Sequence, residues 1–247
     1  MVPLIIFITG IVATALSSMS GGGTSIINIP VLLWLGVPFP LAIATSQVNS
    51  TFWVLPASYN YLKDRKVDWL FLILFSLVGL IGAYFGVQVV LNTDSHVLQT
   101  VIGILILLLV TYTYFKREIG LSETKTYPKA RQLLAYPFAL LLGFYESVFG
   151  SGNGIAFAIV SFYTKGFDFV DALGYYFAVA FPWVVFAAIL FITKGYYSFE
   201  IMLPAVLGSV IGGFIGSKYA KHKGNRFIKL MFVIVGGFLG LKLLLGI

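Results

Sequence analysis

Long apolar runs separated by short polar stretches cover nearly the whole chain of 247 residues. Ten apolar segments are expected, at 3–17, 25–35, 38–62, 68–91, 97–115, 131–148, 155–163, 168–193, 198–217 and 227–246. Crossing a hydrocarbon core of ~30 Å takes about 20 helical residues at a rise of ~1.5 Å each. The segments 25–35 and 155–163 are too short to cross, and 3–17 would reach only ~22 Å. The pattern predicts an all-α integral membrane protein with about 8–10 transmembrane segments, in which the short segments form broken, re-entrant helical hairpins.

The composition supports one membrane domain over 1–247. Hydrophobic residues make up 59% of the chain and charged residues 10%, against about 25% charged residues in soluble domains. The net charge of +7 would suggest nucleic acid in a soluble protein. Here the basic residues cluster in short loops, where orientation in the lipid bilayer and anionic headgroups explain them, so no nucleic-acid partner is expected.

Residues for catalysis or metal binding are sparse in the sequence. There is no cysteine, and the two histidines, His96 and His222, fall in separate predicted loops. No nucleophile–base pair, metal cluster or nucleotide motif stands out. We therefore expect neither an enzyme nor a bound metal or cofactor.

The second half of the chain repeats the first with a shift of 130 residues, which lays Gly22 on Gly152, Gly82 on Gly212 and Gly86 on Gly216. Agreement of glycines over a long ungapped stretch indicates a true internal repeat. We assign repeat 1 to about 3–115, a linker to 116–130 and repeat 2 to about 131–247. Five segments in each repeat is an odd number, so the two repeats should be inverted relative to each other.

The basic residues predict the orientation. Three loops carry them: Lys63, Arg65 and Lys66; Lys116, Arg117, Lys125, Lys129 and Arg131; Lys218, Lys221, Lys223 and Arg226. If the segments alternate sides, all three loops face one side, which should be cytoplasmic. We therefore expect a multi-pass protein of the inner or plasma membrane, with the linker 116–130 cytoplasmic and both termini extracytoplasmic.

Two glycine-rich breaks interrupt the apolar pattern at matching points of the repeats, at 20–25 and 150–154. Irregular backbone at membrane depth is tolerated only where protein buries it or it lines a cavity, and paired breaks of this kind mark binding sites in transporters. The helix that follows each break should direct free N–H groups and a positive dipole end inward, which suits an anion. The candidate substrate-binding residues at the breaks are Gly21, Gly22, Gly23, Thr24, Ser25, Ser151, Gly152, Asn153 and Gly154. The alternative is that these glycines only permit close helix packing.

Polar residues within two apolar segments extend the candidate site. Thr45, Ser46, Gln47 and Asn49 are further candidates for substrate binding, or else they only form hydrogen bonds between helices. Glu146 is the sole carboxylate deep in a predicted span, where an ionisable group costs roughly 2.5–3.5 kcal/mol on insertion scales. We predict that it couples protons or gates the pathway; the alternative is a neutral, hydrogen-bonded Glu146 without such a role.

Several of these residues also carry a family resemblance. Gly21-Gly22-Gly23 is followed by Ile29-Pro30, Leu35-Gly36-Val37-Pro38, Ala42, Ala44-Thr45-Ser46 and then Val67-Asp68-Trp69, with a degenerate second copy at 150–154. Over nearly the whole chain this pattern resembles the sulfite exporter TauE/SafE family. The second copy departs from the family's glycine run at Ser151 and Asn153. The resemblance implies export of small sulfur oxyanions or organosulfonates, such as sulfite or sulfoacetate.

The functional prediction is a secondary transporter that exports a small anion, sulfite or a small organosulfonate, by alternating access, with the anion held at the paired breaks near the midplane. A passive anion channel would use the same site, and a membrane scaffold that transports nothing is the alternative from another class. The coupling ion and the oligomeric state stay open.

Overall fold

A computed structural model describes residues 1–93, 95–116, 118–121, 127–150 and 152–245. These residues form eleven helices and no strand. The helices are α1 Val2–Ser20, α2 Thr24–Trp34, α3 Phe39–Leu62, α4 Trp69–Asn92, α5 Ser95–Phe115, α6 Lys129–Leu133, α7 Tyr136–Phe149, α8 Asn153–Thr164, α9 Phe169–Thr193, α10 Phe199–Lys223 and α11 Asn225–Leu245. The predicted all-α class is thus confirmed.

The predicted apolar segments correspond one to one with helices, except at 131–148. That segment is divided between the short α6 and the longer α7, with a turn at Leu134 and Ala135. Pro137 lies in the first turn of α7. It has no N–H with which to continue a helix from α6, so a new helix begins at this point.

The first helix is longer than predicted. α1 has 19 residues, which gives roughly 28 Å at ~1.5 Å per residue and exceeds the ~22 Å expected for 3–17. The serines at its end continue the helix, with their hydroxyls donating to the helix's own carbonyls, Ser17 to Ala13 at 2.7 Å and Ser20 to Leu16 at 2.8 Å. Within the described residues, α1, α4, α9 and α10 are each long and apolar enough to cross a membrane, and the chain is accordingly a membrane protein.

Glycines on α4 and α10 allow very close helix packing. α4 packs on α7 and α10 packs on α1, while α3 and α9 pack together between these pairs. A Cβ atom at Gly82 would lie 1.9 Å from the carbonyl oxygen of Leu140, and one at Gly212 would lie 2.1 Å from that of Ile11. For these two glycines the structure shows a packing role.

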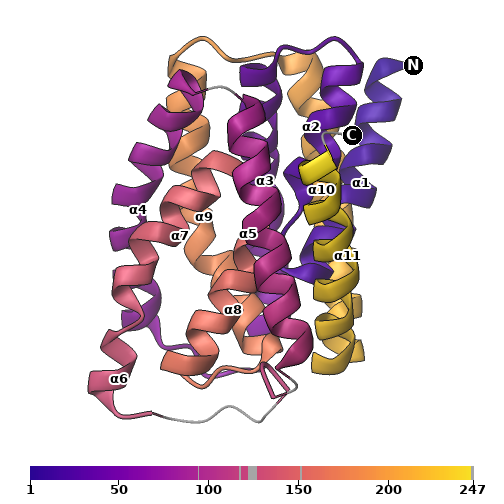
Figure 1. Cartoon of the computed structure of the whole chain (residues 1–247). Coiled ribbons are helices and arrows are strands. Elements are labelled where there is room, and N and C mark those ends of the chain that lie inside the picture. The colour runs from indigo at the N-terminus through magenta and orange to yellow at the C-terminus, as the bar shows by residue number, and fades with distance from the viewer. Residues whose placement is uncertain (94, 117, 122–126, 151, 246–247) are drawn as a thin grey trace.

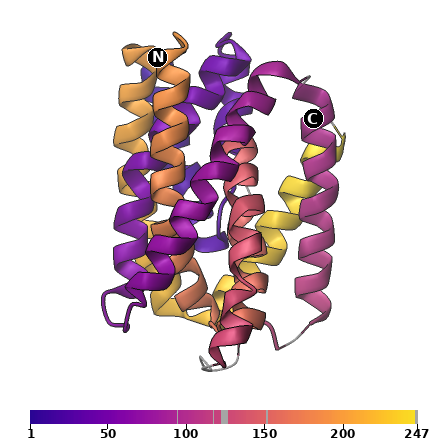
Figure 2. The same ribbon diagram turned by 90° about the vertical axis from the view of Figure 1, so that its left-hand side faces the viewer.

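Each half contains a helical hairpin at its start, and the two hairpins come from opposite ends of the bundle (Figure 1, Figure 2). α1 leads from the N-terminal end to the first glycine break, and α2 returns alongside it. α7 leads from the other end to the second break, and α8 returns until Lys165 donates to Gln132 of α6 at 2.6 Å. The two hairpin turns therefore lie in the interior of the bundle.

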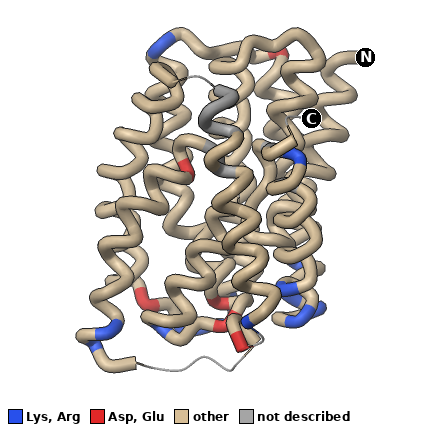
Figure 3. The backbone as a smooth tube through the Cα atoms, viewed as in Figure 1, with Lys and Arg blue, Asp and Glu red and all other residues tan. Residues whose placement is uncertain are grey.

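Most lysine and arginine residues gather at one end of the bundle, and the two termini lie toward the other end (Figure 3). Ion pairs cross between distant loops at the basic end, among them Lys221 with Asp64 at 2.8 Å. The predicted clustering of the basic loops on one face agrees with this arrangement. Part of the linker 116–130, at 117 and 122–126, lies outside the described residues.

Candidate functional site

The first break ends α1 with three glycines in conformations that other residues rarely adopt. The φ angles of Gly21, Gly22 and Gly23 are 73°, 121° and 129°. The N–H of Gly22 donates to the carbonyl of Ser17 at 2.9 Å, which closes the end of α1. Because only glycine populates these conformations readily, the run is required to reverse the chain within the bundle.

The two breaks touch each other. The N–H of Gly154, at the start of α8, donates to the carbonyl oxygen of Gly21 at 2.7 Å. A Cβ atom at Gly22 would lie 3.1 Å from the backbone nitrogen of Gly152. These contacts join the turns of the two hairpins, and the glycines allow this close approach.

Both helices that leave the breaks begin without a side-chain cap. Gly23 precedes α2 and Gly152 precedes α8, and neither provides a side-chain hydrogen bond to the first turn. The first N–H groups of a helix have no partner within that helix. At the start of α8 the Gly154 N–H donates to the Gly21 carbonyl, so the positive ends of both helix dipoles lie beside the same contact.

Polar residues of α3 join the two breaks. The Ser46 hydroxyl lies 2.8 Å from that of Ser25 on α2. Gln47 donates from Nε2 to the backbone carbonyls of Glu146 and Ser147 on α7, at 3.3 and 3.4 Å. Ser46 and Gln47 thus bind a helix from each hairpin, which agrees with the alternative that these residues form hydrogen bonds between helices.

Glu146 is held at the second break. Its side chain is 3% exposed, and its Oε2 atom accepts from Tyr176 Oη at 2.7 Å and from Asn153 Nδ2 at 2.8 Å. The other oxygen faces the break, since a Cβ atom at Gly150 would lie 3.4 Å from Oε1. A Cβ atom at Gly22 would lie 3.7 Å from Tyr176 Oη. The carboxyl group therefore lies beside the place where the two hairpins meet.

Sequence reasoning did not assign a role to Tyr176. The signal was present, because the repeat shift of 130 lays Tyr176 on Ser46. Both residues form a hydrogen bond to the hairpin of their own half, Ser46 to Ser25 and Tyr176 to Glu146. The equivalent positions thus have equivalent roles with different chemistry.

Several buried polar atoms around the breaks have no hydrogen-bond partner among the described residues. They are Thr24 Oγ1, Gln47 Oε1, both Asn49 side-chain atoms, Ser147 Oγ and Asn153 Oδ1. All five side chains are at most 3% exposed. Buried polar atoms are nearly always paired in proteins, and each unpaired one costs about 1–3 kcal/mol. Unpaired atoms on the segments that form the breaks favour this part of the bundle as a place that receives polar ligand groups.

Two of the predicted substrate-binding residues do not belong to this group of unpaired atoms. Ser151 lies outside the described residues. The hydroxyl of Thr45 donates to the carbonyl of Leu41 at 2.8 Å, and the Thr45 side chain lines a small pocket one helical turn away from Asn49. Thr45 is therefore displaced from the cluster of unpaired atoms toward the end where α1 begins.

Partly buried ion pairs lie at the basic end of the bundle. Lys165, which follows α8, binds Asp68 at the start of α4 at 2.7 Å, and Arg65 binds Asp168 at the start of α9 at 3.3 Å. Partial burial alone would raise the pKa of Asp68, but hydrogen bonds from Lys165 and from the Phe71 N–H outweigh it and hold this pKa below its ordinary value. Each pair joins the first half of the chain to the second half.

The fold and the site define a class: a helical membrane protein in which two hairpins bring glycine breaks together around buried polar groups. The sequence model of the family described as "Sulfite exporter TauE/SafE" matches residues 6–243. The chain belongs to this family.

Curated relatives match over nearly their full length. The chain is 28% identical to a "Probable membrane transporter protein" of Haemophilus influenzae, with 97% of this chain and 93% of the relative covered. It is 27% identical to "Probable membrane transporter protein ORF9" of Sinorhizobium sp, covering 97% and 91%. It is 24% identical to "Probable membrane transporter protein YfcA" of Escherichia coli K12, covering 97% and 88%. No solved structure matches the chain significantly. The family and these relatives support a transporter.

Proposed function

We propose that this protein is a secondary transporter that exports a small anion, sulfite or a small organosulfonate such as sulfoacetate, and that it binds the anion where the two glycine breaks meet. The observation that carries the proposal is the contact between Gly154 and Gly21, surrounded by buried polar atoms without partners. The positive ends of two helices without side-chain caps lie there, and helix N-termini are places where oxyanions bind.

The side chains of the site suit an oxyanion as well. The Thr24 and Ser147 hydroxyls and the Asn49 amide can donate to oxygen atoms, and none of them carries a charge. A neutral donor set binds an anion without an ion pair, and release therefore does not require a charged pair to separate. This is the behaviour that a transporter needs, because its substrate must leave again.

We also propose that the two halves of the chain are inverted repeats and that transport occurs by alternating access. α4 packs through Gly82 and Gly86 on α7, and the equivalent α10 packs through Gly212 and Gly216 on α1. Each repeat thus holds the hairpin of the other in the same way, and the hairpins enter from opposite ends. Rocking one repeat against the other around the fixed site would open it to each side in turn.

The direction of transport follows from the orientation that the basic loops favour. With the basic end cytoplasmic, the hairpin α7–α8 is re-entrant from the cytoplasm and the hairpin α1–α2 enters from outside. An inside-negative potential drives anions outward with ~2.3 kcal/mol per charge per 100 mV. Export therefore needs no coupling ion.

Glu146 adds a role for protons. An ionised carboxylate beside the break would repel an anion at the same place, so we propose that Glu146 binds a proton when the anion is bound and releases it when the anion leaves. The test is the pH dependence of transport in Glu146→Gln, which this coupling requires to differ from that of the wild type because the variant has no carboxyl group to bind the proton. A pH profile that matches the wild type would remove the proton from the mechanism and leave anion transport intact.

The experiment for the proposed function is counterflow in proteoliposomes. Vesicles are loaded with sulfite, and uptake of labelled sulfite is measured against sulfate, sulfoacetate and chloride as competitors. A carrier gives saturable uptake that internal sulfite accelerates, and only the true substrates compete. A channel gives flux without acceleration, and a scaffold gives no flux for any anion in folded protein; either result would contradict the proposal.

A further inference from the structure

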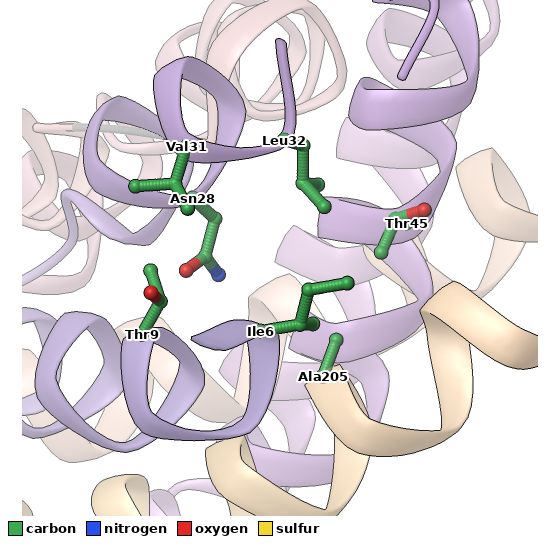
Figure 4. Close-up of a pocket in the computed structure, with 7 residues that line it drawn as sticks. All are labelled: Ile6, Thr9, Asn28, Val31, Leu32, Thr45 and Ala205. Atoms are coloured by element: carbon green, nitrogen blue, oxygen red, sulfur yellow. The ribbon is translucent and has the colours of Figure 1, made fainter. Parts of the chain in front are cut away.

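Two cavities away from the glycine breaks differ greatly in size. A pocket between the arms of the first hairpin, lined by Thr9 of α1 and Asn28 of α2 among others (Figure 4), has a volume of about 10 Å³, which is room for no more than one water molecule. An open groove between α3 and α4, lined also by α9, has a volume of about 740 Å³. Of these two, only the groove can hold a ligand of more than a few atoms.

The groove exists because α3 and α4 pack on the same helix and hardly touch each other. Both of them pack on α9. The lining is mainly apolar, with side chains such as Leu55 of α3, Leu77 of α4 and Phe181 of α9. The two serines in it, Ser58 and Ser76, are each only 6% exposed, so a ligand in the groove would contact an almost wholly apolar wall. An empty gap would forfeit the dispersion contacts of this wall, which favours filling by hydrocarbon.

The groove has the depth of one leaflet of a bilayer. On α4 its lining runs from Trp69, at the basic end of the bundle, to Leu80, a distance of ~16 Å at ~1.5 Å per residue. Half of a hydrocarbon core of ~30 Å is ~15 Å. Trp69 and Tyr59 lie at the mouth and are both 66% exposed, and such aromatic side chains mark the level of the lipid headgroups. The groove therefore reaches from this level to about the bilayer midplane.

One lysine at the mouth has a positive charge without a partner. Lys63 directly follows α3 and lines the groove, and it forms no ion pair with the residues that the structure describes. The neighbouring Arg65 binds Asp168 at 3.3 Å, and the neighbouring Asp64 binds Lys221 at 2.8 Å. Lys63 is therefore the cation that is left to bind a negative group at the mouth of the groove.

We propose that this groove binds one anionic phospholipid, with the phosphate at Lys63 and an acyl chain between α3 and α4. Basic pockets between transmembrane helices are places where anionic headgroups bind. A phospholipid has its charge and its hydrocarbon at the two levels where the groove has Lys63 and the apolar wall. A second copy of the chain fits less well, because it would bring the same basic loops to the level of Lys63.

Native mass spectrometry of the purified protein, titrated in detergent with phosphatidylglycerol or with phosphatidylcholine, counts bound lipids directly. We expect one phosphatidylglycerol to bind more tightly than phosphatidylcholine. Lys63→Gln should weaken the binding of phosphatidylglycerol about fivefold and leave that of phosphatidylcholine unchanged. Lys129→Gln is the matched control, because Lys129 of α6 does not line the groove, and it should bind both lipids as the wild type does.

Leu77→Trp tests the groove itself. The Leu77 side chain lines the groove and is 55% exposed, so a larger ring would fill the groove without entering the protein core, and binding of both lipids should fall. Leu74→Trp is the matched control, since Leu74 is exposed on the same helix and does not line the groove.

Three results would overturn the proposal. One is equal affinity of the wild type for the two lipids, and another is wild-type binding of phosphatidylglycerol in either Lys63→Gln or Leu77→Trp. Displacement of the lipid by inorganic phosphate would assign Lys63 to a free anion. Protein dimers that Leu77→Trp dissociates would place a second copy of the chain in the groove, and this result would contradict the proposal as well.

Discussion

The contact between the two breaks can be tested by adding one methyl group. In Gly154→Ala the new Cβ atom would lie 2.2 Å from the carbonyl oxygen of Gly21, whereas ordinary contact begins at 3.4 Å. The two backbones would therefore have to separate by about 1.2 Å, the difference between these values. Gly154 does not have a positive φ, so alanine introduces no backbone strain and acts only through this collision.

Three contributions determine how far Gly154→Ala changes the free energy of unfolding. Overpacking costs about 1–3 kcal/mol, and loss of the hydrogen bond from the Gly154 N–H to Gly21 costs about 0.5–1.5 kcal/mol. Replacing a helical glycine with alanine returns about 1 kcal/mol. We therefore expect Gly154→Ala to destabilise the protein by about 0.5–3.5 kcal/mol and to abolish sulfite counterflow, because the two helix starts no longer converge.

The assay combines thermal unfolding in detergent with counterflow in proteoliposomes. Gly237→Ala in α11 is the matched control, because a Cβ atom there meets only Val110, at 4.0 Å. This control should be as stable as the wild type or more so, and it should transport normally. If Gly154→Ala has wild-type stability and wild-type counterflow, the breaks do not need their close contact and the reasoning is refuted.

Three further predictions follow from other contacts. Tyr176→Phe removes one donor from Glu146, and it should shift the pH profile of transport while thermal stability changes by at most about 1.5–3 kcal/mol; an unchanged profile would show that Tyr176 is only structural. Lys165→Met leaves Asp68 without its ammonium partner. The lowered pKa of Asp68 stabilises the folded state at pH values above about 3.8, the ordinary pKa of an aspartate. This stabilisation is lost as the pH falls through the lowered pKa. Thermal unfolding of the wild type should therefore be more acid-sensitive than that of Lys165→Met. Equal acid sensitivity would contradict the assignment. Gly82→Ala should disrupt the packing of α4 on α7, since its Cβ atom would lie 1.9 Å from the Leu140 oxygen, and a stable, active variant would show that this crossing is not tight.

Much of the fold could be predicted because apolar runs and glycine breaks are local signals. The bounds of α3, Phe39–Leu62, differ by one residue from the predicted start and not at all from the predicted end. The length of α1 could not be predicted in this way. Its terminal serines appear as polar loop residues in a hydropathy pattern, and only the hydrogen bonds to their own helix reveal that they continue it.

The candidate site was predictable in its location and less so in its contacts. The repeat pattern places the two breaks at equivalent points of the two halves, and in the structure the hydrogen bond from Gly154 to Gly21 joins them. Which polar atoms have partners depends on neighbours far away in sequence. Gln47 donates to Glu146, 99 residues away, and no local pattern shows that. The ion pair of Lys165 with Asp68 was missed for the same reason, since it joins residues 97 apart.

The measurement that tests the central claim most directly is equilibrium binding of labelled sulfite to the purified protein. We predict saturable binding in the wild type and in Gly237→Ala, and its loss in Gly154→Ala and in Asn49→Ala. The first of these variants separates the breaks and the second removes an unpaired amide beside them. Sulfite binding with wild-type affinity in both Gly154→Ala and Asn49→Ala would place the anion elsewhere and contradict the account.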